Sequence, residues 1–258
     1  MRLNFSMLVD LRSTVECLAY YLGEYDSEYI RGLLRLFRPD WTVLDVGANI
    51  GFWTIPMASA LRGGGRLHAF EPVASNFLRL VENVRRNGLE RVVQAHQLGL
   101  SDQDTVLRIS LREGFANGAE TGNAEIVIDQ DDCRYECVDI NVARLDDLAG
   151  SLGIDRLDFV KVDIEGYEDK FLAGARRAIQ RFRPIILLEI NDLCYERRGL
   201  DATAVFERWQ SEASYEAAYA ISPRVWVLRG VRERKGKVEN VMLVPSEKAE
   251  SVIGLLGP

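Results

Sequence analysis

The stretch VLDVGANIGFWT, residues 43–54, takes the chain from an apolar strand into a glycine-rich turn and then into an apolar helical run. Gly47 and Gly51 stand on either side of Asn49, a pattern typical of backbone that another group approaches closely. In α/β sheets, ligands bind at the carboxyl ends of strands, where this turn falls. The stretch therefore predicts both a strand-to-helix fold and a ligand site.

Apolar strands and helical runs alternate around this turn, as expected of a parallel sheet covered on both faces. We predict an α/β fold with a doubly wound, mostly parallel, Rossmann-like sheet of seven strands. The last two predicted strands, 224–230 and 238–245, are joined by too short a segment for a crossover helix. They are expected to form an antiparallel C-terminal hairpin, and residues 6–38 an N-terminal helical lead-in.

Composition limits the classes of partner. The chain has 258 residues and a formal net charge of −7, which argues against nucleic acid, because phosphate binding needs an excess of Lys and Arg. No apolar run is long enough to span a membrane, and no signal peptide is evident. Four scattered cysteines indicate reduced thiols. We expect a cytoplasmic protein without a membrane span, and a homodimer is left open.

The residues of the turn distinguish between classes of nucleotide-binding site. A dinucleotide site would read G-x-G-x-x-G and a phosphate loop would end in Gly-Lys-Ser/Thr, whereas this chain reads G-A-N-I-G. The second predicted strand ends at Glu71, twenty residues after Gly51. A carboxylate there can accept hydrogen bonds from both hydroxyls of a ribose. The pair indicates an adenosine site without a pyrophosphate.

Five segments together resemble the FkbM-type S-adenosylmethionine-dependent methyltransferases, over roughly residues 20–245. They are VLDVGANIGFWT (43–54), FEPVASNFLRLVENVRRNG (70–88), GLSD (99–102), DFVKVDIEGYE (158–168) and IILLEI (185–190). The resemblance implies O-methylation of a sugar, glycan, polyketide or other secondary metabolite, with S-adenosyl-L-methionine as cofactor. It divides the chain into a helical lead-in, residues 1–40, and a methyltransferase domain, residues 41–258.

The resemblance also implies roles for particular residues. The methionine part of the cofactor is expected beside the first turn, the ribose at Glu71, and the adenine beside the segment after the third strand. GEYD, residues 23–26, is similar to a Gly-x-Tyr-Glu element of the family, which makes Tyr25 a substrate candidate, although Asp26 departs from that pattern. The other residues implied are Asp45, Gly47, Asn49 and Gly51 for the methionine part, and Ser101 and Asp102 for the adenine.

An alcohol acceptor must lose a proton, and the two histidines, His68 and His96, are expected to be packed inside strands. The base is therefore expected among carboxylates. Asp163 is the first choice, and the same group is a candidate for binding the cofactor. The supporting candidates are Glu189 as a second acidic group, Lys161 as a salt-bridge partner, and Glu165 as a substrate contact. A metal-independent base is preferred, and oxygen ligands holding Mg²⁺ stay open as the alternative.

Two other readings of the chain are weighed against a methyltransferase. A nicotinamide-dependent dehydrogenase is disfavoured by the G-A-N-I-G spelling. A non-catalytic partner that binds S-adenosylmethionine is disfavoured by the acidic cluster at 163–165. The expected partner is a small-molecule or glycan acceptor, beside the homodimer that is left open.

Overall fold

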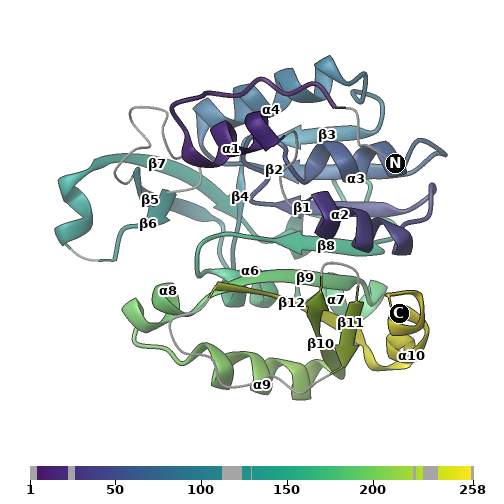
Figure 1. Cartoon of the computed structure of the whole chain (residues 1–258). Coiled ribbons are helices and arrows are strands. Elements are labelled where there is room, and N and C mark those ends of the chain that lie inside the picture. The colour runs from purple at the N-terminus through teal and green to yellow at the C-terminus, as the bar shows by residue number, and fades with distance from the viewer. Residues whose placement is uncertain are drawn as a thin grey trace.

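The structure is a computed structural model that describes residues 5–22, 27–111, 124–128, 130–222, 225–228 and 238–256. Within these residues the central sheet has eight strands, in the order β11-β10-β12-β9-β8-β1-β2-β3 (Figure 1). Their bounds, in chain order, are β1 Thr42–Val46, β2 Arg66–Phe70, β3 Val93–His96, β8 Phe159–Val162, β9 Ile185–Asn191, β10 Tyr215–Ser222, β11 Val225–Leu228 and β12 Val238–Pro245.

The neighbours from β3 to β9 pair in parallel, whereas β12 pairs antiparallel with β9. Helices cover both faces of this sheet. On one side lie α2 Ser27–Leu33, η1 Leu34–Leu36, α3 Thr54–Ala60, α4 Ala74–Arg86 and α10 Ala249–Leu256; on the other lie α5 Leu145–Leu148, α6 Glu168–Gly174, α7 Arg176–Phe182, α8 Asp192–Arg197 and α9 Ala202–Ala213. The predicted doubly wound α/β class is confirmed, although the described central sheet has eight strands and not the seven predicted.

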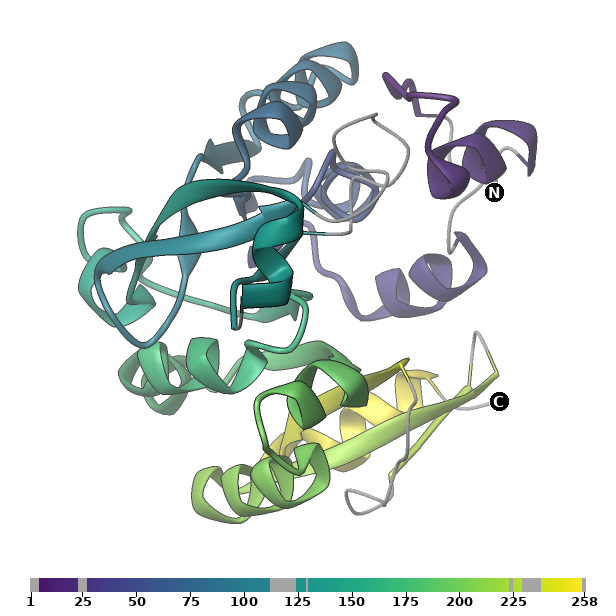
Figure 2. The same cartoon turned by 90° about the vertical axis from the view of Figure 1, so that its left-hand side faces the viewer.

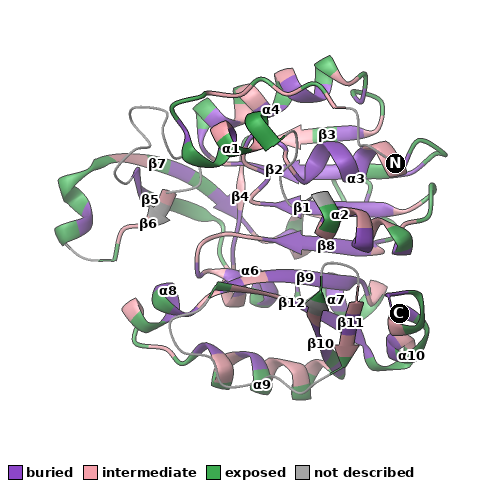
Figure 3. Cartoon of the chain, in the orientation of Figure 1, coloured by how far each residue is buried: buried purple, intermediate pink, exposed green. Residues whose placement is uncertain are grey.

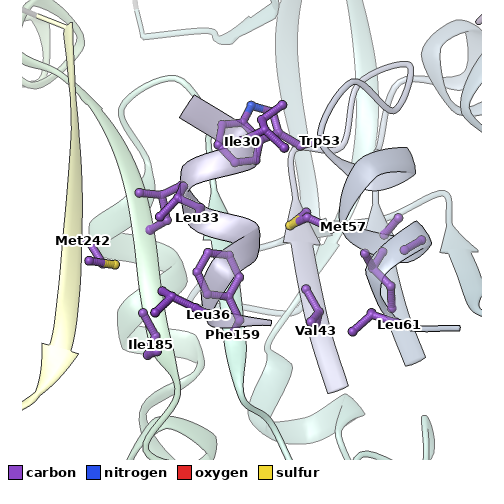
Figure 4. Close-up of a cluster of buried hydrophobic side chains, with 14 of the residues drawn as sticks. Ile30, Leu33, Leu36, Val43, Trp53, Met57, Leu61, Phe159, Ile185 and Met242 are labelled. Carbon is purple, nitrogen blue, oxygen red and sulfur yellow. The ribbon is translucent and has the colours of Figure 1, made fainter. Parts of the chain in front are cut away.

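Alternation along each strand builds the two layers. Val43 of β1 packs into the cluster under α2 and α3, while Leu44 packs into the cluster under α6 and α7. Figure 4 shows the first cluster, where Ile30, Leu33 and Leu36 pack against Val43 and Phe159 of the sheet. The strands of the middle of the sheet are therefore buried on both faces (Figure 3).

The expected C-terminal hairpin is wrong in its pairing. β11 pairs with β10, and β12 lies between β10 and β9, so the last two strands are not neighbours. Residues 241–245 of β12 are all buried, and an uninterrupted apolar strand is stabilised by a position inside the sheet rather than at its edge. The shorter β11 takes the edge.

A second sheet, which the sequence did not predict as a separate unit, stands at the carboxyl ends of the central strands (Figure 2). Its order in the described residues is β4-β7-β5-β6, with a short helix before β7. The bounds are β4 Gly99–Leu100, β5 Thr105–Leu111, β6 Ala124–Ile126, η2 Gln130–Arg134 and β7 Glu136–Ala143. Within residues 93–100 the chain thus passes from β3 of the central sheet to β4 of the second sheet.

The N-terminal lead-in contains α1 Thr14–Leu22, which is tied to α4. Glu16 is fully buried and accepts hydrogen bonds from Arg79 of α4, and Leu8 donates its N–H to Asn83 at 2.6 Å. η3, Ser246–Lys248, leads into α10. Of the helices described, none is both long and apolar enough to cross a membrane.

Candidate cofactor pocket and acidic cluster

The glycine turn after β1 is built on left-handed backbone. Gly47, Asn49 and Gly51 have φ of 80°, 50° and 102°. A Cβ on Gly47 would lie 1.9 Å from the carbonyl oxygen of Asp163, at the end of the adjacent strand β8, and one on Gly51 would lie 3.0 Å from the Leu80 side chain. The groups that approach these two glycines in the structure are therefore parts of the protein itself, and they restrict the turn to glycine at both positions.

Glu71 follows β2 directly, and its carboxylate is buried with 5% exposure. One oxygen accepts the N–H of Asn49 at 2.8 Å and the other accepts the N–H of Val73 at 2.9 Å. Burial raises the pKa of Glu71 to about 7, although the two N–H donors oppose that rise. The predicted ribose residue thus also anchors the glycine turn to the end of β2.

Asp45 and Lys161 face each other across the β1–β8 register, and both side chains are buried. Nζ of Lys161 donates to Asp163 at 2.8 Å and lies 5.7 Å from the ring centroid of Trp53. Burial alone would lower the pKa of Lys161, but the charges of Asp163, Asp45 and Glu189 raise it above its ordinary value. Lys161 is therefore a permanent cation that brings the predicted acidic residues into one cluster.

The carboxylate of Asp45 has a hydrogen-bond partner on only one of its two oxygens among the described residues. Oδ2 accepts from the Thr54 hydroxyl at 2.6 Å, whereas Oδ1 is buried without a hydrogen-bond partner among the described residues. Burial raises the pKa of Asp45, and the charge of Lys161 opposes it. Asn49 likewise has a buried Oδ1 with no partner in the part of the chain described. These two oxygens are acceptors with unused capacity.

Ser101 and Asp102 follow β4, but they point to different surroundings. Ser101 lines the pocket described below, whereas Asp102 is not among its described lining residues and pairs with Lys170 of α6 at 2.9 Å. Asp132 of η2 pairs with Arg197 of α8 at 2.7 Å. These ion pairs tie the second sheet to the helices that follow β8 and β9.

A pocket of about 140 Å³ lies where these features meet. Its polar part comes from the ends of β1, β2 and β8, and its apolar part from the inner face of the second sheet. The polar lining includes Gly47, Asn49, Glu71, Ser101, Asp163, Glu165 and Tyr167, and the apolar lining includes Val73, Leu107, Ile109, Ile126, Ile140 and Val142. The pocket is therefore two-sided in chemistry, with acidic and amide groups at one side and hydrocarbon at the other.

The predicted residues do not all reach this pocket. Asp45, Gly51, Lys161 and Glu189 are not among its described lining; the first three are buried, and Glu189 is half-buried in β9. Glu165 shares the lining with Glu71. Tyr25 lies outside the described residues. No group of three or more His, Cys, Asp or Glu in the described chain is placed to hold a metal ion.

His68 is packed inside its strand, as predicted, whereas His96 is the last residue of β3 and is half-buried. His68 is 2% exposed, and its Nδ1 lies 3.2 Å from Nε2 of His96, with the rings nearly parallel. Burial lowers the pKa of His68 to about 4, with a smaller contribution from His96.

The apolar wall of the pocket was missed, although the sequence carried a signal for it. Leu107 and Ile109 of TVLRISL line the pocket, and so do Ile140 and Val142 of ECVDINVA. In each segment the two lining residues are two positions apart. This period of two is typical of a half-buried strand. The pattern does not predict which part of the protein the buried face of these strands lies against.

Comparison with known protein families decides the family. A model described as the methyltransferase FkbM domain matches residues 45–217, which include the glycine turn, Glu71 and the acidic cluster. The chain belongs to the FkbM methyltransferase family. The resemblance stated from the motifs is thereby confirmed.

The FkbM-family chain is similar to three curated proteins whose names differ. It is 30% identical over 191 residues to the 31-O-demethyl-FK506 methyltransferase FkbM of Streptomyces tacrolimicus, covering 65% of this chain and 72% of that protein. It is 28% identical over 166 residues to the hexuronic acid methyltransferase AglP of Haloferax volcanii, covering 64% and 62%. It is 30% identical over 184 residues to the AMB antimetabolite synthetase AmbE of Pseudomonas aeruginosa, but spans 8% of its length against 60% of this chain.

Among solved structures, the FkbM-family chain is similar to methyltransferase FkbM from Methylobacillus flagellatus KT, with a TM-score of 0.54 and 20% identity. The match covers 85% of this chain and 48% of that one. At this identity the likeness supports the fold alone. It agrees with the mixed α/β architecture described above.

Proposed function

We propose that this FkbM-family methyltransferase uses S-adenosyl-L-methionine to methylate a hydroxyl group of a sugar, glycan or secondary metabolite. The observation that carries the proposal is Glu71, a carboxylate at the end of β2 that lines a pocket together with the Gly47–Asn49 turn. This is the arrangement that a ribose diol without a neighbouring pyrophosphate requires.

The residues present fit that cofactor. A carboxylate offers about four acceptor positions, and Glu71 has two N–H donors, which leaves capacity for hydroxyl donors. The unpartnered buried oxygen of Asn49, which lines the pocket, supplies a further acceptor for the cationic amino group of the cofactor. The apolar wall formed by Ile140, Leu107 and their neighbours supplies a surface for an uncharged aromatic base beside Ser101. Gly47 and Gly51 keep the turn in the conformation that presents these groups.

S-adenosylmethionine supplies, when bound, a methyl group on a sulfonium, so the chain must align an acceptor oxygen and remove its proton. We assign the proton acceptor to Asp163, whose carboxylate is 28% exposed at the end of β8. Lys161 orients that carboxylate through the 2.8 Å hydrogen bond, and Glu189 balances the charge of Lys161 from β9. In the proposal the base is metal-independent, with Mg²⁺ bound by the carboxylates as the alternative.

We propose the class of acceptor from the names of two relatives. One acts on 31-O-demethyl-FK506, a secondary metabolite, and another on a hexuronic acid, so hydroxyls on both kinds of molecule are reasonable first substrates. Tyr25 and Glu165 remain the substrate candidates. Because Glu165 lines the pocket with Glu71, we also consider it a candidate contact for the cofactor.

Incubation of the purified chain with S-adenosylmethionine and a panel of hydroxylated sugars, uronic acids and macrolides tests the proposal. The expected result is a product heavier by one methyl group, attached to oxygen, with release of S-adenosylhomocysteine. Methylation at nitrogen or carbon would overturn the assignment to oxygen. Tight S-adenosylmethionine binding without turnover on any acceptor would favour a non-catalytic partner, and binding of NAD⁺ in its place would favour a dehydrogenase.

A further inference from the structure

The loop between β8 and α6 lines the pocket with Asp163, Ile164, Glu165 and Tyr167. Its backbone is unusual, because Glu165 has φ of 52° and Gly166 has φ of 88°. A left-handed conformation is strained for a residue other than glycine, because its Cβ crowds the following carbonyl oxygen. Contacts with the rest of the protein must therefore hold Glu165 in this conformation.

The contacts come from Glu168, the first residue of α6, which is fully buried. Its Oε1 accepts the N–H of Ile164 at 3.2 Å and the N–H of Gly166 at 3.1 Å. The N–H groups of the two residues on either side of Glu165 thus donate to one carboxylate oxygen. Burial raises the pKa of Glu168 to about 7, with the hydroxyl and N–H donors opposing.

Tyr195 of α8 holds the other oxygen of Glu168. Its hydroxyl donates to Oε2 at 2.8 Å and accepts the N–H of Asp169 at 3.3 Å, and the side chain is fully buried. α8 also packs directly on the loop, because a Cβ on Gly166 would lie 2.3 Å from the Cβ of Cys194. Neither Glu168 nor Tyr195 is among the described residues that line the pocket.

We propose that Glu168 and Tyr195 form a positioning pair that sets the 163–167 loop for cofactor binding without touching the cofactor. The proposal rests on the proposed function, since the ligand is taken to be S-adenosylmethionine. The pair fixes Ile164 and Glu165 against the pocket, and it fixes the end of β8 from which Asp163 projects. Cofactor affinity should therefore depend on a hydroxyl group buried one layer behind the pocket.

Tyr195→Phe deletes that hydroxyl alone, and the chain offers a matched control. Tyr215 is also buried, its hydroxyl donates to the carbonyl of Pro184 at 3.0 Å, and an Arg side chain lies over its ring, as at Tyr195. Pro184 precedes β9, so Tyr215 lies at the end of the sheet away from the pocket. Tyr215→Phe therefore reports the cost of losing a buried tyrosine hydroxyl where no effect on the cofactor is expected.

The measurements are calorimetric affinity for S-adenosylhomocysteine, thermal stability, and hydrogen exchange at the amides of Ile164 and Gly166. We expect both variants to lower the melting temperature, and Tyr195→Phe alone to weaken affinity at least fivefold and to speed exchange at the two amides. Glu168→Gln, which keeps one acceptor oxygen, should bind more tightly than Glu168→Ala.

Equal affinity and equal exchange in Tyr195→Phe and Tyr215→Phe would overturn the positioning role. A wild-type chain that binds no S-adenosylhomocysteine would instead refute the proposed function. In that case the exchange rates still decide whether the pair holds the loop.

Discussion

The titration of Glu71 provides a test of the cofactor site that needs no acceptor. Burial raises the pKa of this carboxyl to about 7, because loss of solvation outweighs the N–H bonds from Val73 and Asn49. Near neutral pH the group is therefore about half protonated in the free protein. Ribose hydroxyls donate best to the ionised form, so cofactor binding should release a proton from Glu71.

The sign and size follow from this linkage. The ionised fraction of a group with a pKa of about 7 rises from about one tenth at pH 6 to about nine tenths at pH 8. If only the ionised form binds well, affinity rises roughly tenfold over that interval, or about 1.4 kcal/mol, and falls as the pH drops below 7. At pH values above 8, replacement of Glu71 by Ala should cost roughly 1.5–3 kcal/mol of binding free energy, which is the size of a charged hydrogen bond.

Titration calorimetry of S-adenosylhomocysteine across this pH range, in two buffers of different ionisation enthalpy, measures both affinity and proton release. Glu168 also has a pKa of about 7, so Glu71→Gln is the required comparison. The variant should bind weakly and lose most of the pH dependence. A slope that persists in Glu71→Gln, or a wild type with no slope, would refute the reasoning.

Three further outcomes are expected. Gly47→Ala places a Cβ against the Asp163 carbonyl and should destabilise the chain by more than Gly88→Ala, which has similar left-handed backbone but open space, as chemical denaturation would show. Asp163→Asn should reduce turnover by roughly 10²–10⁴ with a smaller change in cofactor affinity; activity lost with EDTA and restored by Mg²⁺ would instead favour the metal route. The pKa of the buried His68 is lowered to about 4, so the side chain takes up a proton on unfolding, and stability should fall as the pH drops from about 6.5 towards 4. In His68→Leu the number of protons taken up on unfolding in this pH range should be smaller by nearly one.

The polar side of the pocket, where we propose that the cofactor binds, was largely predictable because its residues lie at strand ends. Once VLDVG and RLHAF are assigned to adjacent parallel strands, Gly47 and Glu71 must meet at the carboxyl edge, and they do, through the bond from Asn49 to Glu71. Local pattern and sheet geometry suffice for that inference.

Other features depend on tertiary packing that local pattern does not encode. The strands 105–111 and 136–143 could be recognised, but not that they leave the central sheet and cover the pocket. The bond between Glu168 and Tyr195 joins residues 27 apart on two helices, and no spacing rule predicts it. The insertion of β12 between β9 and β10 similarly reflects which strand gains most from burial on both faces.

We propose that the pocket beside Glu71 binds S-adenosylmethionine. Calorimetric titration of S-adenosylhomocysteine and, separately, of NAD⁺ into the wild type and Glu71→Ala tests it most directly. We expect saturable binding of S-adenosylhomocysteine that weakens by roughly 1.5–3 kcal/mol in the variant, and no binding of NAD⁺. Unchanged affinity in Glu71→Ala, or tighter binding of NAD⁺ than of S-adenosylhomocysteine, would contradict it.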